Sequence, residues 1–408
     1  METISQKDRN IIRILAKQKR DLHHSEKNQR NLNDWLRHNS LTCERPMIHL
    51  EISFRHEMIP KRLRCEGTSA RQIEERLWEG IINHGVLGDD YPVSDNFWVE
   101  WNTRHIPFGM DVEFIHANNS MGYRVDYPIK DLDADYDKFG QSVYQIDKAA
   151  SMAYADIAAD IFGDILPVKI GISAFKVCPT RFFVHVMGME MLLFSMYDSP
   201  EKFHDLMRRF AEDTIGYFRF LEANDAVNST AGTEYLGQGS WCFTNELPKV
   251  GPVTSREMWG FLDSQESVSI SPAMFEEMIF PYYKMIADQY GLLSYGCCEP
   301  VHQFWGSLSR LTNLRKITVS PWCDEEFMGE ALKGTKTIYH RKTSPNFLGI
   351  GQNLDEPALR EHVRRTLKAA KGCTLEITQR DVYTINNDEG KARRFVEIIR
   401  EEIASKWI

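Results

Sequence analysis

Short apolar runs alternate with longer amphipathic stretches over most of this chain. Eight apolar runs stand out, at residues 46–54, 167–175, 226–230, 258–262, 292–295, 316–319, 337–339 and 373–377. Between most of them, apolar residues recur with helical spacing, at residues 200–221, 272–289, 301–311, 325–332, 356–370 and 390–405. Short buried strands that alternate with helices predict βαβ units and a parallel sheet. Since eight parallel strands close a barrel, the pattern predicts an α/β protein built as a (β/α)8 TIM barrel.

Two segments lie outside this alternation. Residues 4–38 carry scattered apolar residues, among them Ile12, Leu15 and Trp35, between many charged and amide side chains, which is typical of amphipathic helices that pack on another element. Residues 86–136 are rich in Pro, Gly, Asp and aromatic residues, which favours irregular or short-strand structure. We therefore predict an N-terminal helical arm at residues 1–45 and a barrel at 46–408, with residues 86–145 as an inserted cap.

Composition and charge exclude several classes of protein. The 408 residues carry a formal net charge of −9, and so acidic a chain is not expected to bind nucleic acid. The longest nearly apolar stretch, residues 186–196, is shorter than the roughly 20 residues of a membrane span. The charged N-terminus lacks the apolar core of a secretory signal, so we expect a cytoplasmic protein without membrane association. Eight cysteines are too few for a disulfide scaffold and are expected as free thiols, core residues or metal ligands.

The strongest candidates for chemistry follow the run at 292–295. The chain continues there into Cys297, Cys298 and Glu299, at the strand edge where a barrel of this type holds its active site. Thiolates beside a carboxylate are suitable zinc ligands. Because neighbouring residues of a strand point to opposite faces, only one of the two cysteines is expected to reach a metal. The alternative is that both thiols simply fill the core, as free cysteines often do.

Other predicted strands also end in titratable residues. Glu234 and Glu266 follow the runs at 226–230 and 258–262, and a solvated loop carboxylate is the alternative for each. His340 follows the run at 337–339, and Asp381 follows the run at 373–377. Glu299, His340 or Asp381 would then reach toward a zinc ion held by one of the cysteines.

Several longer motifs carry a resemblance to a known family. They are LRCE (63–66), MGMEMLLFSMYDSPEKFHDLMRRF (187–210), DSQES (263–267), SPAMFEEMIFPYYKMIA (271–287), YGCCEP (295–300), VSPWCDEE (319–326) and the closing unit that begins CTLEITQRDVY (373–383). With them the chain resembles the uroporphyrinogen decarboxylase superfamily over residues 165–408, and most of all its uroporphyrinogen decarboxylase-like members. The resemblance implies the (β/α)8 barrel.

The superfamily includes two chemistries. Its decarboxylases hold the porphyrinogen with an N-terminal motif of the type PxWxMRQAGR, whereas this chain reads PMIHLEISFRHE at residues 46–57, so we expect no decarboxylation of a tetrapyrrole. Its other branch consists of zinc-dependent, corrinoid-linked methyltransferases with a His-x-Cys motif and a later Cys. This chain has Tyr295-Gly296-Cys297 at the first position and Gln379-Arg380-Asp381 at the last. The resemblance implies that the metal ligands are among Cys297, Cys298, Glu299 and Asp381, with one of the two cysteines bound, a harder set that suits an oxygen-bearing donor.

The sequence therefore predicts a metal-assisted methyltransferase that moves a methyl group from a small methylated donor, such as a methoxylated aromatic, to a corrinoid. Glu234, Glu266, Tyr295 and His340 are its candidate catalytic residues. Because the chain lacks the Asp-x-His-x-x-Gly pattern, the corrinoid is expected on a partner protein or as free cobalamin. A homodimer that exchanges the arm is compatible with the resemblance. The alternatives are a metal-free or metal-assisted decarboxylase or lyase of a small carboxylated substrate, and a non-enzymatic protein that binds a corrinoid or tetrapyrrole.

Overall fold

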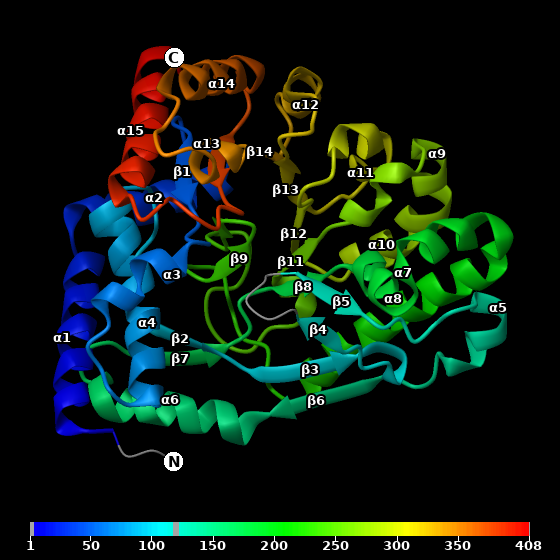
Figure 1. Cartoon of the computed structure of the whole chain (residues 1–408), viewed down its shortest axis with the longest axis horizontal. Helices are drawn as coiled ribbons and strands as arrows, with labels where there is room; N and C mark the ends of the chain where they lie inside the picture. The colour runs from blue at the N-terminus through cyan, green and yellow to red at the C-terminus, as the bar shows by residue number, and fades with distance from the viewer. Residues whose placement is uncertain (1–3, 117–121, 408) are drawn as a thin grey trace.

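The centre of the molecule is a parallel sheet (Figure 1). The computed structural model describes residues 4–116 and 122–407. Each strand of the sheet runs parallel to its neighbours, which confirms the predicted α/β architecture. The seven strands follow in the order β1 (Met47–Leu50), β15 (Leu375–Gln379), β14 (Ile338–Lys342), β13 (Leu314–Val319), β12 (Leu292–Tyr295), β11 (Trp259–Leu262) and β8 (Phe175–Val177).

The sheet differs from the predicted barrel, because the described residues do not close it between β8 and β1. The single strand expected at 167–175 divides in two. Its first part is β7 (Val168–Gly171), which pairs with β2 (Phe97–Glu100), whereas the second part is β8, which pairs with β11. The two parts thus contribute to different sheets.

The run at 226–230 is a loop rather than the predicted strand. Its one bridge joins Asn228 to Pro252. The backbone N–H of Ser229 donates to the carbonyl of Gly251, and the Ser229 hydroxyl donates to the carbonyl of Pro248. These local bonds satisfy polar groups that a strand would have paired with its neighbours. The hairpin of β9 (Tyr235–Gly237) and β10 (Ser240–Trp241) follows, and Figure 1 shows β9 inside the curve of the sheet.

Helices cover the outer side of the sheet at most of the predicted places. They include α8 (Pro200–Ala223), α12 (Glu325–Leu332), α14 (Glu356–Ala369) and α15 (Glu389–Lys406). The helix expected at 272–289 is divided into α9 (Pro272–Met274), a π-helical turn (Phe275–Ile279) and α10 (Phe280–Ala287). Pro281 explains the division, since it has no N–H for the helical ladder and its ring displaces the preceding turn. The segment expected as a helix at 301–311 forms a 3-10 turn (Val301–Phe304) and α11 (Trp305–Leu308).

The N-terminal segment forms α1 (Gln6–His23) and α2 (Glu26–Asn39). Ser5 and Ser25 cap the two helices, since their hydroxyls accept the N–H groups of Asp8 and Asn28. Helix α1 packs on α4 (Thr68–Ile82) and α6 (Lys148–Phe162). The end of α2 reaches the amino end of the sheet, where His38 Nε2 lies 3.0 Å from Glu376 Oε2.

The segment predicted as a cap contains two antiparallel pairs besides β2. They are β3 (Asn102–Ile106) with β6 (Val143–Asp147), and β4 (Phe114–His116) with β5 (Tyr123–Val125). Figure 1 shows β3 and β6 along the side of the molecule opposite α14 and α15. No helix in the described ranges has the length and apolar character that crossing a membrane requires.

Candidate functional site

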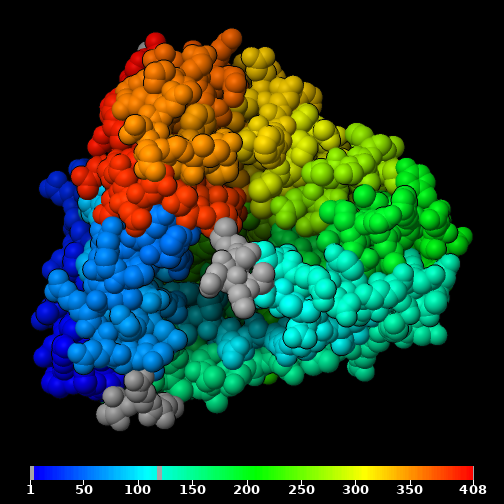
Figure 2. Space-filling view, in the orientation of Figure 1, coloured from blue at the N-terminus to red at the C-terminus, as the bar shows by residue number. Residues whose placement is uncertain are grey.

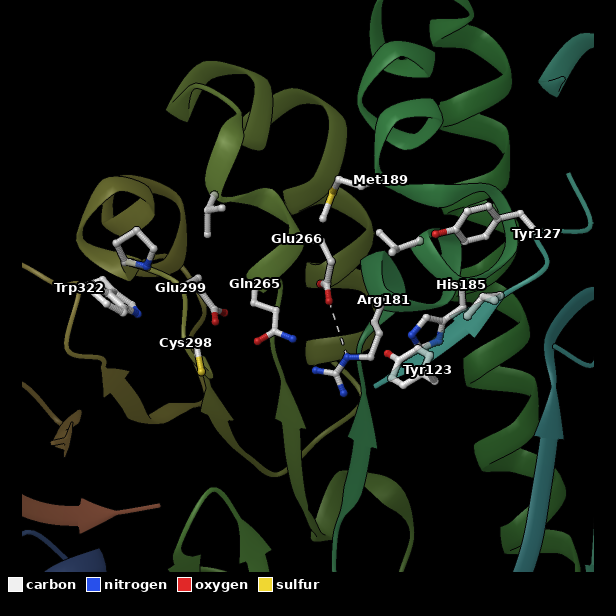
Figure 3. Close-up of a pocket in the computed structure, with 14 residues that line it drawn as sticks. Tyr123, Tyr127, Arg181, His185, Met189, Gln265, Glu266, Cys298, Glu299 and Trp322 are labelled. Atoms are coloured by element: carbon white, nitrogen blue, oxygen red, sulfur yellow. Dashed lines mark ion pairs between the residues drawn. The ribbon is translucent and has the colours of Figure 1, made fainter. Parts of the chain in front are cut away.

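The carboxyl ends of β8, β11, β12 and β13 border a cavity of about 690 Å³, which we call the mouth cavity (Figure 3). Its remaining wall comes from the cap and from α7 (Pro179–Asp198). Aromatic and apolar side chains form much of the lining, among them Tyr123, Tyr127, Met189 and Trp322. Polar side chains line the rest, among them Arg181, His185, Gln265, Glu266, Cys298 and Glu299. This is the place where parallel barrels hold their active sites.

Arg181 organises the acidic side of the mouth cavity. Its Nη2 lies 2.8 Å from Asp263 Oδ2, and its Nε lies 3.6 Å from Glu266 Oε1, the ion pair drawn in Figure 3. The other oxygen of Glu266 accepts the Thr180 hydroxyl at 2.8 Å. Burial raises the pKa of Asp263, although Arg181 opposes this shift. The guanidinium is therefore already shared between two carboxylates of the protein.

His185 lies on the same helix as Arg181 and also lines the cavity. Burial lowers the pKa of His185, and the neighbouring Arg181 lowers it further. The imidazole is therefore neutral at pH 7, because its ordinary pKa is already below 7. Both residues follow β8 closely in the chain. Polar residues that follow a predicted strand are therefore the sequence signal that points to them.

Cys297 and Cys298 do not point to opposite faces, contrary to the expectation for two strand residues. Strand β12 ends at Tyr295, and Gly296 has a φ of +99°, a conformation that glycine adopts without strain. The two Sγ atoms lie 3.7 Å apart as a result. Cys298 lines the mouth cavity, whereas Cys297 lies beside Lys342, whose Nζ is 3.7 Å from Cys297 Sγ.

The two thiols have pKa shifts of opposite sign. The hydrogen bond from Cys297 lowers the pKa of Cys298 to about 6, and the positive charges of Lys342 and Arg380 act in the same direction. The same hydrogen bond and burial raise the pKa of Cys297. The pair thus shares one proton, with Cys297 as the thiol and Cys298 as the thiolate.

Glu299 is fully buried at the wall of the mouth cavity. Its two oxygens accept the backbone N–H groups of Ser264 at 3.0 Å and Cys297 at 2.8 Å. Burial raises the pKa of Glu299 to about 7, and the nearby Asp263 contributes to the shift. The carboxyl thus holds the loops after β11 and β12 together and retains a proton for part of the time at neutral pH.

The predicted metal ligands do not fit a zinc ion in this arrangement. Both oxygens of Glu299 take backbone N–H groups, and Asp381 lies 3.6 Å from the Arg380 guanidinium. The Lys342 ammonium lies beside Cys297, where its positive charge would oppose a metal cation. In residues 4–116 and 122–407, no three His, Cys, Asp or Glu side chains are grouped so that they could hold a metal ion.

The predicted catalytic residues lie in different places. Glu266 reaches the mouth cavity, as described above. His340 lies inside the sheet, where Nε2 is 3.0 Å from Thr378 Oγ1 and burial lowers its pKa to about 3. Tyr295 is fully buried against Tyr283. Glu234 lines a second cavity, which shares no lining residue with the mouth cavity.

The comparisons with known proteins assign no family to the chain. No family model matches the chain, and no curated protein matches it. Among solved structures, a methyltransferase from Methanosarcina mazei is similar, with 12% sequence identity and a TM-score of 0.47. The similarity covers 80% of this chain and 85% of that one. So distant a likeness assigns neither a family nor an activity to the chain.

Proposed function

We propose that the protein is a methyltransferase whose small methylated donor binds in the mouth cavity. The observation that carries the proposal is the composition of this cavity. Aromatic and apolar side chains (Tyr123, Tyr127, Met189 and Trp322) face the Arg181–Glu266 pair and the Cys298 thiolate at the carboxyl edge of the sheet. A cavity of about 690 Å³ has room for a small ring compound.

The lining supports a methoxylated aromatic as the donor. An aromatic ring would pack against Trp322, which lies beside Cys298 and Glu299 in Figure 3, since offset and edge contacts between rings are favourable. Oxygen substituents on the ring would accept hydrogen bonds from Gln265 and from the N–H groups of Arg181 that remain free of carboxylates. Position and orientation of the donor are thereby set by groups that the fold already holds in place.

Transfer of a methyl group from oxygen requires a proton for the oxygen that leaves. The methyl carbon forms a bond to the nucleophilic acceptor while the electron pair of the broken C–O bond stays on the oxygen. Glu299 can supply the proton, since it lines the cavity and its carboxyl is partly protonated near pH 7. We propose a corrinoid as the acceptor, carried by a partner protein or free, whose reduced cobalt supplies the nucleophile.

The charge of the cavity favours methyl transfer over the lyase alternative. A decarboxylase needs a cation that is free to hold the substrate carboxylate, whereas Arg181 already contacts Asp263 and Glu266. A porphyrinogen carries several carboxylates and would meet the same obstacle. We therefore expect no carboxyl loss from uroporphyrinogen, which chromatography of the product against a reaction without enzyme checks.

The proposal is tested with reduced cobalamin and a panel of donors: methoxylated aromatics, methylamines and methyl thioethers. We expect the spectrum of methylcobalamin to develop with a methoxylated aromatic. Glu266→Gln should slow the transfer by about 10²-fold, since it breaks the pair that positions Arg181. Glu190→Gln, an exposed change on the same helix as Arg181, should leave the rate unchanged. No transfer from any donor, with a candidate corrinoid protein also present, would contradict the proposal.

A further inference from the structure

A second cavity, of about 560 Å³, lies between the helical arm and the β9–β10 hairpin, and we call it the arm cavity. One wall consists of α1 and α4, which contribute Lys19 and Arg76. The opposite wall includes the loop before β9, which contributes Glu234. Figure 2 shows a hollow on this face between the blue N-terminal helices and the cyan strands. The proposed methyl transfer makes no use of this cavity.

The helical wall presents two cations whose hydrogen bonds go to backbone carbonyls. Lys19 Nζ donates to the Asn96 carbonyl at 2.8 Å, and Arg76 Nη2 donates to the Trp98 carbonyl. Neither side chain forms an ion pair with a carboxylate of the described part of the chain. Burial lowers the pKa of Lys19 to about 8, the positive charge of Arg76 adds to this shift, and the carboxylates of Glu79 and Asp95 oppose it in part. A bound anion would relieve the repulsion between the two cations.

The loop before β9 contributes the carboxylate of Glu234 to the lining. Glu234 Oε2 accepts the backbone N–H of Gly232 at 2.9 Å, and the structure forms no ion pair at Glu234 within its described ranges. Burial raises the pKa of Glu234, and the Gly232 N–H and the positive charge of Lys169 oppose this shift only in part. Glu100 is in a similar position, since Oε2 accepts only the N–H of Ser173, at 3.2 Å.

The remaining carboxylates of the arm cavity each form an ion pair. Glu79 pairs with Arg55, and Glu51 pairs with Arg380 at 3.2 Å. The unpaired charges that remain are therefore the cations of the helical wall and the carboxylates of Glu100 and Glu234. A ligand with a single charge would satisfy one wall and be repelled by the other, whereas a zwitterion would satisfy both.

Aromatic side chains in the arm cavity indicate which kind of cationic group the ligand would carry. Tyr91, Trp98 and Tyr383 line the cavity, and the indole N–H of Trp98 has no hydrogen-bond partner among the described residues. Aromatic faces beside a carboxylate attract alkylated ammonium groups, because the ring quadrupole favours the cation and the alkyl groups lose contact with water.

We propose that the arm cavity is a second binding site, for a small zwitterion that carries a carboxylate and an alkylated ammonium. The carboxylate lies between Lys19 and Arg76, and the ammonium lies against Glu234 and the aromatic side chains. The site is separate from the mouth cavity, and its existence does not depend on the proposed methyl transfer.

Isothermal titration of the full-length protein with glycine betaine tests this site. We expect saturable binding, and binding about ten-fold weaker or more for tetramethylammonium and for acetate, since each offers one charge only. Glu234→Gln and Lys19→Met should each weaken betaine binding by about ten-fold or more. Lys17→Met, an exposed change on the same helix, and Gln265→Ala in the mouth cavity should leave the affinity unchanged.

Three results would overturn the proposal. They are no betaine binding by the wild type, wild-type affinity in both the Glu234→Gln and the Lys19→Met variant, and loss of betaine binding in Gln265→Ala. Glu234→Gln is the decisive variant. The Glu234 side chain accepts one hydrogen bond in the fold, and we expect the loss of its charge to leave the structure intact. An unchanged circular dichroism spectrum and thermal midpoint verify this for each variant.

Discussion

At the scale of single residues, the loop after β12 places two cysteine thiols in different surroundings. Cys297 is buried beside Lys342, whereas Cys298 lines the mouth cavity. Their Sγ atoms share a hydrogen bond, and this bond places the negative charge on Cys298. A thiolate at neutral pH is unusual for a cysteine, whose ordinary pKa is about 8.5.

We expect iodoacetamide to alkylate Cys298 with a rate that is half-maximal near pH 6, because only the thiolate attacks and the pKa is lowered to about 6. Below that pH the rate should fall, and above it the rate should level off. Cys297→Ala removes the hydrogen bond and should move the midpoint upward by about one pH unit or more. Timed labelling between pH 5 and pH 9, followed by peptide mass spectrometry, measures the midpoint.

Cys373→Ala is the matched control for this experiment. Cys373 is buried far along the chain, where its Sγ donates to the carbonyl of Gly329. Its removal should leave the midpoint of Cys298 unchanged. A wild-type midpoint near pH 8.5 would show that the two thiols do not share a proton.

At the scale of elements, three neighbouring strands and the arm meet in a buried polar network inside the sheet. Glu376 of β15 lies at its centre. Glu376 Oε2 accepts hydrogen bonds from Lys316 Nζ of β13 and His38 Nε2 of α2, both at 3.0 Å. His340 Nδ1 of β14 lies 3.2 Å from the other oxygen. These contacts hold the pKa of Glu376 well below its ordinary value in spite of burial.

Glu376→Gln should lower the free energy of unfolding by about 3–5 kcal/mol, because the fully buried Lys316 ammonium would lose its counter-charge. Asp288→Asn is the matched control, since it breaks an exposed ion pair between Lys284 and Asp288. Pairs of that kind contribute about 0–1 kcal/mol. Urea unfolding followed by circular dichroism compares the variants. A loss for Glu376→Gln as small as that of the control would contradict a stabilising role of the network.

At the scale of the whole molecule, both helices of the arm pack against the rest of the chain. Ile12, Leu15 and Ala16 of α1 share a buried apolar cluster with Ile73 and Leu77 of α4. At the far end, the Asn39 amide donates to the Trp241 carbonyl at 3.0 Å. The arm thus contributes Lys19 to the arm cavity and packs on the amino end of the sheet.

Ile12→Ala should therefore lower the free energy of unfolding of the protein by about 2–5 kcal/mol, since it leaves a cavity in this cluster. Ile12 is 0% exposed, whereas Ile14 on the same helix is 66% exposed. Ile14→Ala should change the stability by about 0.5 kcal/mol or less. Urea unfolding monitored at the tryptophans reports on the whole chain. If Ile12→Ala left the urea midpoint unchanged, the arm would not belong to the same folded unit as the sheet.

The sequence by itself determined the features that depend on neighbouring residues. Helix α12 has the bounds that periodicity predicts, and β12 occupies the predicted run at 292–295. Local patterns fix such elements because helices and strands repeat at short intervals along the chain. Polar residues at strand ends, read from the same pattern, included Glu266, Cys298 and Glu299 of the mouth cavity.

Only the tertiary structure decided which of the polar residues meet. Residues 168–171 and 175–177 read as one strand, yet they pair with different partners, and the sheet stays open between β8 and β1. His340, Glu234 and Glu266 all follow predicted strands, yet they lie in the interior, the arm cavity and the mouth cavity. Pairing and side-chain direction depend on residues far apart in the chain, and no local pattern records those contacts.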